Sequence, residues 1–216
     1  MRPRSVDLIL FDLDGTLVDS LADLTAAVNH TLREYGRFPL DPCLVREYVG
    51  DGVRKLMERS LAGEDPASLD RAVAQFRTYY GSHLLDHTRL YPGVAEVLQH
   101  FTEKVKAVVT NKPQEFSLKI LEGLGIAQHF AMVVGGDSGQ EQKPHPQPAQ
   151  HILTGLGVGA ARTAMVGDSP VDIEMAKRAG LFACAVTYGL RSREELQAAG
   201  PDLLLDDLRE LCRHLL

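Results

Sequence analysis

The sequence is poor in several residues that mark particular classes of protein. It has no tryptophan, 6% aromatic residues and three cysteines, Cys43, Cys184 and Cys212, which are odd in number and in no metal-ligand pattern. We therefore interpret them as reduced thiols of a cytoplasmic protein. No segment approaches the roughly 20 apolar residues of a membrane span, and no apolar secretion signal follows Met1. The net charge of -6 argues against nucleic acid binding, which normally needs a basic face.

The length and the order of apolar segments predict an α/β fold. With 216 residues, 44% hydrophobic and 24% charged, the chain can form one large core or two unequal domains. From Tyr91 onward, short apolar runs alternate with amphipathic stretches, which predicts a parallel, doubly wound, Rossmann-like sheet. The predicted strands are 8–11, 105–109, 132–134, 163–166, 182–186 and 203–205, and the predicted helices are 94–101, 113–124, 146–156, 170–179 and a closing helix to 216.

The segment between the first strand and Tyr91 has a different pattern. Leu17 to about Asp86 shows the helical spacing of apolar residues, broken by turn signals, and we predict no strand within it. A βαβ unit normally returns to the sheet after roughly 30 residues, so this stretch is too long for a simple crossover. We therefore predict an inserted all-helical cap domain at 17–87, with the catalytic core formed by 1–16 and 88–216.

Polar residues follow three of the predicted strands, at the point where each strand ends. These residues are Asp12 and Asp14, Thr110 and Asn111, and Asp168 and Asp172. Because parallel strands end at the same edge of a sheet, we expect these side chains to gather there. Each one alone could equally cap the helix that follows its strand. Together they predict an acidic cluster with hydrogen-bond donors beside it.

An acidic cluster needs a cation or a proton to offset the repulsion between carboxylates. All candidate ligands here are oxygens, and no cysteine or histidine belongs to the group. Such a set suits Mg²⁺, which takes one or two carboxylates, several waters and often a substrate phosphate. The hydroxyl of Thr110 and the backbone N–H groups at the start of the next helix are suited to bind that anion. The sequence therefore predicts Mg²⁺ and a phosphate ligand.

Lys143 lies in the loop before the helix expected to begin at Pro146. A lone lysine in a loop is most often a solvated surface charge. Held between Gln142 and Pro144, it can instead reach the carboxyl edge of the sheet and act as a point charge for phosphate. The residues alone leave both interpretations open.

Taken together, these residues resemble the haloacid dehalogenase-like hydrolases, in which Asp-x-Asp-Gly-Thr follows the first strand. The resemblance extends over essentially the whole chain, including a helical cap inserted directly after the first motif. The four matching segments are Asp12-Leu13-Asp14-Gly15-Thr16, Val109-Thr110-Asn111, Lys143-Pro144 and Gly167-Asp168-Ser169-Pro170-Val171-Asp172.

The resemblance implies roles for the residues that carry out the chemistry. Asp12 would be the nucleophile, and Asp14 would be the general acid and base. Thr110 and Lys143 would bind the phosphoryl group, with Asn111 beside them. Lys143 would also offset the negative charge of the nucleophile. Dehalogenase members typically lack the second aspartate, so the presence of Asp14 indicates phosphate chemistry.

The resemblance also implies a set of metal ligands. Mg²⁺ would be held by Asp12, by the backbone carbonyl of Asp14 and by Asp168. Asp172 would support the site. The expected activity is a Mg²⁺-dependent phosphatase that acts on a small phosphate ester through an aspartyl-phosphate intermediate.

The cap segment 48–59 resembles the cap loop of the phosphoglycolate phosphatases, where a Gly-x-Gly turn faces the catalytic aspartates. This resemblance implies that Gly50, Gly52 and Arg54 bind substrate, and that the substrate is 2-phosphoglycolate. The alternative is a glycine-broken pair of helices with Arg54 in solvent.

Other activities share most of these features. Within the same superfamily, a pyrophosphatase, a sugar-phosphate phosphatase or a phosphomutase is the alternative. From another class, a receiver-type signalling domain also places acidic residues, a threonine and a lysine on a doubly wound sheet, but it spans about 120 residues and needs no cap. For the quaternary state we expect a monomer or a homodimer.

Overall fold

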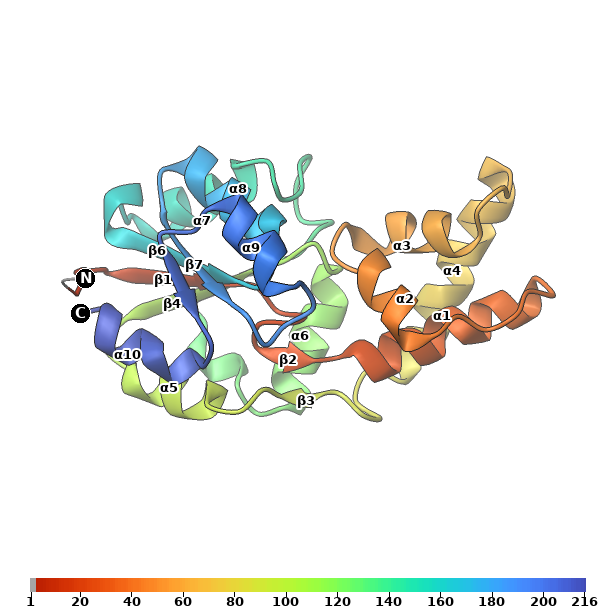
Figure 1. Ribbon diagram of the computed structural model, residues 1–216, viewed down its shortest axis with the longest axis horizontal. Helices are drawn as coiled ribbons and strands as arrows, with labels where there is room; N and C mark the ends of the chain where they lie inside the picture. The colour runs from red at the N-terminus through yellow and green to blue at the C-terminus, as the bar shows by residue number, and fades with distance from the viewer. Residues whose placement is uncertain (1–2) are drawn as a thin grey trace.

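A parallel β-sheet forms the centre of the larger part of the molecule in this computed structural model, which describes residues 3–216 (Figure 1). Across the described chain the sheet has six strands in the order β5-β4-β1-β6-β7-β8. They are β1 (Leu8–Phe11), β4 (Val105–Val109), β5 (Met132–Val134), β6 (Thr163–Gly167), β7 (Phe182–Val186) and β8 (Leu203–Leu205). The predicted α/β class is confirmed, and β1 lies in the middle of the sheet between β4 and β6.

Helices cover both faces of this sheet. Along β1, Leu8 and Leu10 pack into one apolar cluster while Ile9 and Phe11 pack into the other, because successive side chains of a strand point to opposite faces. The first face carries α7 (Gln147–Leu156), α8 (Pro170–Ala179) and α9 (Arg193–Ala199), and the second carries α5 (Val94–His100), α6 (Gln114–Gly123) and α10 (Leu211–His214). The sheet is therefore buried on both sides, as its continuous apolar strands predict.

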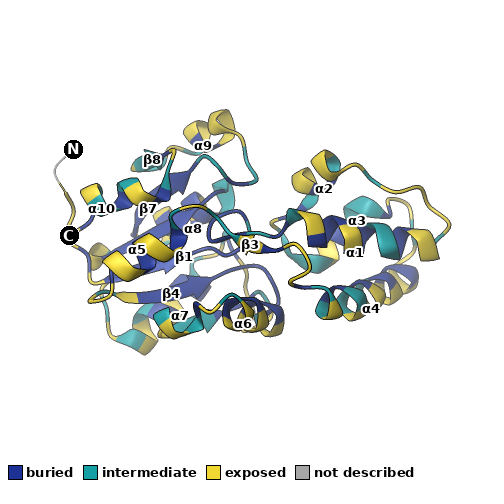
Figure 2. Cartoon of the chain, turned by 90° about the horizontal axis from the view of Figure 1, so that it is seen from below, coloured by how far each residue is buried: buried dark blue, intermediate teal, exposed yellow. Residues whose placement is uncertain are grey.

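A separate group of helices lies beyond one edge of this core (Figure 1). Between residues 21 and 82 the chain forms α1 (Leu21–Glu34), α2 (Pro42–Tyr48), α3 (Gly52–Ser60) and α4 (Pro66–Ser82). Each buries one face against the others and leaves the opposite face in solvent (Figure 2). The apolar interior of this group includes Val28, Leu32, Phe76 and Tyr80. We call α1–α4 the cap.

The chain enters and leaves the cap through a short ribbon that the sequence does not predict. Strand β2 (Val18–Asp19) pairs antiparallel with β3 (Arg89–Leu90). The expectation of continuous helix from Leu17, without any strand, is therefore wrong at its start, and α1 begins at Leu21. The pairing joins residues about 70 positions apart, so no local pattern reports it. Two further differences are α9, which was not predicted, and a closing helix that ends at His214.

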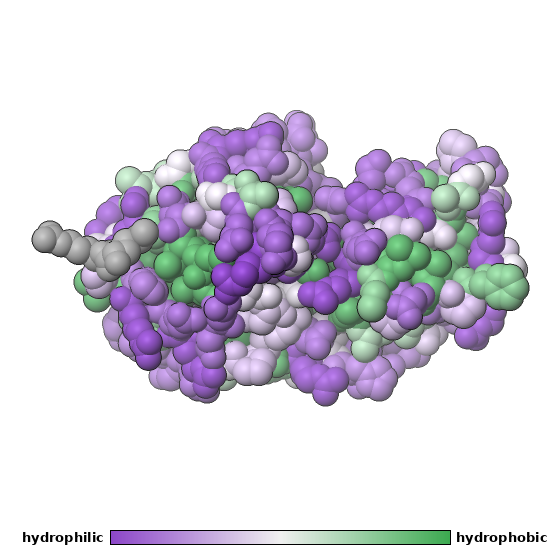
Figure 3. Space-filling view, viewed as in Figure 1, coloured by the Kyte–Doolittle hydropathy of each residue, from purple (hydrophilic) through white to green (hydrophobic). Residues whose placement is uncertain are grey.

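The face of the molecule drawn in Figure 3 is mainly polar. In the view of Figure 3, hydrophilic side chains dominate, and apolar side chains gather over parts of the core and of the cap. No helix within residues 3–216 is both long and apolar enough to cross a membrane. The three cysteines form no disulfide, as predicted: Cys184 is buried and Cys43 is exposed.

Candidate active site

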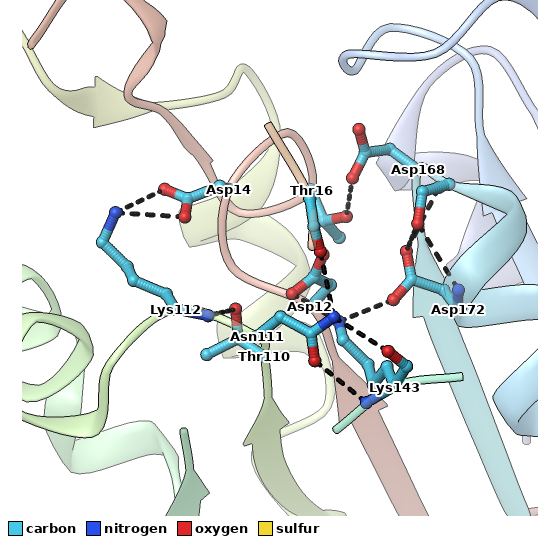
Figure 4. Close-up of polar contacts among 11 residues, drawn as sticks. Asp12, Asp14, Thr16, Thr110, Asn111, Lys112, Lys143, Asp168 and Asp172 are labelled. Atoms are coloured by element: carbon cyan, nitrogen blue, oxygen red, sulfur yellow. Dashed lines mark hydrogen bonds and ion pairs between the residues drawn. The ribbon is translucent and has the colours of Figure 1, made fainter. Parts of the chain in front are cut away.

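The predicted site residues meet at the carboxyl edge of the sheet (Figure 4). Asp12 follows β1 directly, Thr110 and Asn111 follow β4, and Asp168 follows β6. Since β4 and β6 both pair with β1, their ends deliver these side chains to one place. The expected gathering of polar side chains at this edge is confirmed by the geometry.

Three carboxylates form a compact cluster. Asp12, Asp168 and Asp172 each offer one oxygen, and these oxygens lie within 4.8 Å of one another. Asp172 belongs to the first turn of α8, where it accepts hydrogen bonds from the backbone and the hydroxyl of Ser169. This capping box fixes the start of α8 and aims the other oxygen of Asp172 at the cluster.

Lys143 reaches into this cluster. Its Nζ lies 2.7 Å from an oxygen of Asp12 and 2.7 Å from an oxygen of Asp172. The side chain is 3% exposed, so the surface-charge interpretation is wrong. Asn111 holds the backbone of this lysine on both sides, accepting from Lys143 N at 2.9 Å and donating to Lys143 O at 3.0 Å. The loop before α7 is thus fixed to the end of β4.

Burial and repulsion shift the protonation of the cluster. Burial raises the pKa of Asp12 to about 6. The charge of Lys143 lowers this pKa and the charge of Asp172 raises it, but burial has the largest effect. Burial, Asp12 and Asp172 together raise the pKa of Asp168 to about 8. Burial by itself would lower the pKa of Lys143, but the carboxylates of Asp12 and Asp172 outweigh it and the pKa is raised. The lysine therefore stays charged while the carboxylates compete for protons.

The cluster suits a divalent cation. When all are ionised, the three carboxylates carry two more negative charges than Lys143 offsets. Among the described residues, Asp12 Oδ1 is the buried side-chain oxygen that accepts no aligned hydrogen bond, although Lys143 lies beside it. A cluster of carboxylate oxygens without nitrogen or sulfur ligands is the donor set of a hard cation such as Mg²⁺.

Tight backbone packing surrounds Asp168. Its oxygens accept hydrogen bonds from Thr16 Oγ1 at 3.0 Å and from Leu190 N at 2.7 Å. A Cβ at Gly15 would lie 2.2 Å from Asp168 Oδ2, and Gly15 also has a φ of +86°. A Cβ at Gly189 would lie 2.3 Å from Asp168 Cβ. The glycine after Asp14 is therefore required both by the turn and by this close approach.

Asp14 lies apart from the cluster and has partners that the sequence reasoning missed. Lys112 Nζ lies 3.1 and 3.0 Å from its two oxygens, and Ser20 Oγ donates to it as well. Lys112 also donates to the hydroxyl of Tyr80, on α4, at 2.7 Å. Lys112 directly follows Thr110 and Asn111, so its position after a strand was an available signal. The sequence gives no such signal for Tyr80, because this residue belongs to the cap and follows no strand of the sheet.

A cavity of about 50 Å³ lies between Asp12, Asp14 and the cap. The lining from the cap includes Leu24, Gly50, Gly52, Val53, Leu56 and Phe76. The Gly50 carbonyl accepts a hydrogen bond from Asn111 Nδ2 at 2.9 Å, and Gly50 and Gly52 line the same cavity as Asp12 and Asp14. Arg54 is not brought to this cavity: its side chain is 54% exposed and pairs with Asp70.

Comparison with known proteins agrees with this geometry. A family profile described as haloacid dehalogenase-like hydrolase matches residues 9–186. The chain belongs to the haloacid dehalogenase-like hydrolases. It is 38% identical over 218 residues to the phosphoglycolate phosphatase of Chromobacterium violaceum, covering 98% of this chain and 97% of that protein. It is also 38% identical over 213 residues to the Pseudomonas putida phosphoglycolate phosphatase, covering 94% and 78%.

Solved structures of this family share the whole architecture. The crystal structure of a predicted phosphoglycolate phosphatase from Haemophilus somnus is similar with a TM-score of 0.91 and 34% identity, covering 95% of this chain and 96% of that one. A predicted phosphatase from Clostridium acetobutylicum is similar with a TM-score of 0.86 and 27% identity, covering 96% of each chain. A haloacid dehalogenase-like hydrolase with this architecture is not a receiver-type signalling domain.

Proposed function

We propose that this protein is a Mg²⁺-dependent phosphatase that hydrolyses 2-phosphoglycolate to glycolate and phosphate. The observation that carries the proposal is the buried Asp12, held beside Lys143 and facing the small cavity under the cap. That cavity has room for a few water molecules, which favours a small leaving group over a large one. The names of the related phosphoglycolate phosphatases support the same substrate.

In the proposed mechanism, a carboxylate oxygen of Asp12 attacks phosphorus, and the bond from phosphorus to the leaving oxygen breaks. Asp14 gives its proton to that oxygen. In the second step Asp14 takes a proton from water as the water attacks the aspartyl-phosphate, which restores both residues. Lys143 and the Thr110 hydroxyl would bind the phosphoryl oxygens, and Asn111 would hold the backbone of Lys143 in place.

The metal would bind at the acidic cluster. Asp12, Asp168 and the backbone carbonyl of Asp14 would hold Mg²⁺, with Asp172 supporting the site through Lys143. When bound, the ion supplies positive charge where the nucleophile and the phosphoryl oxygens meet. The close approach of oxygens from Asp12, Asp168 and Asp172, within 4.8 Å of one another, supports this assignment.

The remaining parts of the proposal concern the cap and the setting. Residues 17–87 would act as a mobile cap that closes over the substrate and excludes water, with Gly50 and Gly52 forming part of the substrate pocket. Free thiols at Cys43, Cys184 and Cys212 favour a reducing compartment, so we place the enzyme in the cytoplasm. It would work as a monomer or homodimer, without a nucleic acid or membrane partner.

The proposal is tested by measuring phosphate release from 2-phosphoglycolate, pyrophosphate and a set of sugar phosphates, with and without Mg²⁺. We expect the highest kcat/KM for 2-phosphoglycolate and no turnover in EDTA. A higher kcat/KM for pyrophosphate or a sugar phosphate would identify that compound, and not 2-phosphoglycolate, as the preferred substrate. Metal-independent turnover would contradict the mechanism.

A further inference from the structure

Lys112 is the cation that lines the cavity under the cap, among the residues that the structure describes. It comes from the end of β4, and its side chain is 3% exposed. Its Nζ contacts Asp14 at 3.0 Å and Tyr80 Oη at 2.7 Å (Figure 4 shows the contact with Asp14). Burying an ammonium group costs free energy unless it is paired, and the carboxylate of Asp14 supplies that pairing here.

The phosphoryl side of the site already has its own lysine. Lys143 is held between Asp12 and Asp172, whereas Lys112 contacts the carboxylate of Asp14 on the cap side. The surrounding wall from the cap is apolar, with Leu24, Val53, Leu56 and Phe76. Such a wall offers few partners for the hydroxyl groups of a sugar. Among the described residues that line the cavity, Lys112 is the cation that can attract a negatively charged leaving group.

We propose that Lys112 binds a carboxylate on the leaving group of the substrate and so determines specificity for anionic phosphate esters. This inference rests on the proposed function, in which Asp14 protonates the leaving oxygen. Lys112 Nζ lies 3.0 Å from Asp14 Oδ2. When Asp14 contacts the leaving oxygen of the substrate, a carboxylate one carbon away from the leaving oxygen falls within reach of the ammonium.

Tyr80 completes this subsite from the cap. Its hydroxyl accepts a hydrogen bond from Lys112, and that leaves its own hydrogen for an oxygen of the substrate. Burial raises the pKa of Tyr80 to about 12, with Lys112 opposing the rise, so the hydroxyl stays protonated at neutral pH. A bound carboxylate would therefore contact one residue of the core and one of the cap.

The test compares two esters that differ in one group: 2-phosphoglycolate, which carries a carboxylate, and 2-hydroxyethyl phosphate, which carries an alcohol. For Lys112→Met we expect kcat/KM for the carboxylate ester to fall about 100-fold, mainly through KM, the loss expected for a charged hydrogen bond. For the neutral ester we expect a change below about three-fold. Lys112→Arg should retain most of the discrimination, and Lys55→Met, at an exposed position, should change neither value.

Equal losses on the two esters would overturn the inference, because Lys112 would then act through Asp14 alone. A second test uses the wild-type enzyme and measures inhibition by the two products. Glycolate should inhibit at least ten-fold more strongly than ethylene glycol. Equal inhibition would also overturn the inference. If the folded wild-type protein hydrolyses neither ester, the proposed function itself fails; if it hydrolyses both equally well, the function stands and the role of Lys112 does not.

Discussion

The two sides of the candidate site are built on different principles. The side from the core consists of buried charges, with Asp12, Asp168 and Asp172 around Lys143. The side from the cap is mostly apolar, and its polar groups are the Gly50 carbonyl and the Tyr80 hydroxyl. In the proposed mechanism the core would therefore carry out the chemistry, and the cap would shape the pocket that selects the substrate. Changes to the two sides should therefore have separable effects.

Arginine side chains that donate to backbone carbonyls join the core to the cap. Arg46, at the end of α2, donates to the carbonyls of Gly189 and Leu190 in the core. Arg191 donates in return to the carbonyls of Arg46 and Val49 in the cap. Leu190 also donates its N–H to Asp168. This reciprocal pair of arginines therefore connects the cap to a loop whose backbone binds the carboxylate of Asp168.

The largest expected effect is the loss of the nucleophile on the core side. Asp12→Asn should lower kcat by about 10⁴-fold or more, because an amide cannot form the aspartyl-phosphate. Phosphate release under single-turnover conditions measures this change. Asp70→Asn, an exposed aspartate on α4, is the matched control and should keep wild-type turnover. Substantial activity in Asp12→Asn would show that Asp12 is not the nucleophile.

Removing the cation of the cluster should cost stability. Lys143→Met leaves Asp12 and Asp172 without their buried partner, and we expect the free energy of unfolding to fall by about 3–5 kcal/mol at pH 8. Urea denaturation without metal measures it. The loss should shrink toward pH 5, since Asp12, whose pKa is raised to about 6, is then mostly protonated and no longer needs the lysine. A loss that is the same at both pH values would contradict this account.

A cavity made in the cap should affect stability without touching the chemistry. Leu56 is buried on α3 and lines the pocket, so Leu56→Ala should destabilise the protein by about 2–4 kcal/mol. Leu56→Met, which keeps the volume, should cost far less. Thermal unfolding measures both. A fall in the rate of chemistry as large as that of Asp12→Asn would show that the two sides are not separable.

The pH dependence of stability should belong to the core side. The pKa of Asp168 is raised to about 8 in the folded state, so the metal-free folded protein binds more protons than the unfolded chain between about pH 4 and pH 8. Stability should therefore fall as pH rises through that window, by up to about 1.4 kcal/mol per pH unit for this group. Asp168→Asn should flatten the curve, and saturating Mg²⁺ should do the same in the wild type. A curve unchanged by the substitution would assign the effect to other groups.

The smallest effect is expected for Arg54, on the outer surface of the cap. Its ion pair with Asp70 is exposed, and such pairs contribute about 0–1 kcal/mol. Arg54→Ala should change both the free energy of unfolding and kcat/KM for 2-phosphoglycolate only slightly, within about two-fold for the latter. A ten-fold rise in KM would instead show that Arg54 turns inward when substrate binds.

Some parts of the site follow from local sequence because a general rule of topology places them. Asp12, Thr110 and Asp168 were predicted to meet because each follows a strand of a parallel sheet. Lys143 could not be assigned from its own neighbours, because only the fold shows that its loop is held by Asn111. Tyr80 could not be assigned for the same reason, because its hydrogen bond with Lys112 joins the cap to the core. Lys112 itself follows Thr110 and Asn111 after β4, so its place at the site could have been inferred from the sequence.

Local sequence patterns predicted the six strands of the parallel sheet, the helical insertion after the first strand and the oxygen-rich character of the site, but not β2, β3 or α9. The predicted features depend on periodicity and on residue types over short stretches. Only the tertiary structure decided that β2 pairs with β3, that Arg54 points outward and that Lys112 lies between Asp14 and Tyr80. These contacts join residues that lie on different elements, so they depend on how the elements pack in three dimensions and not on the residue pattern around each position.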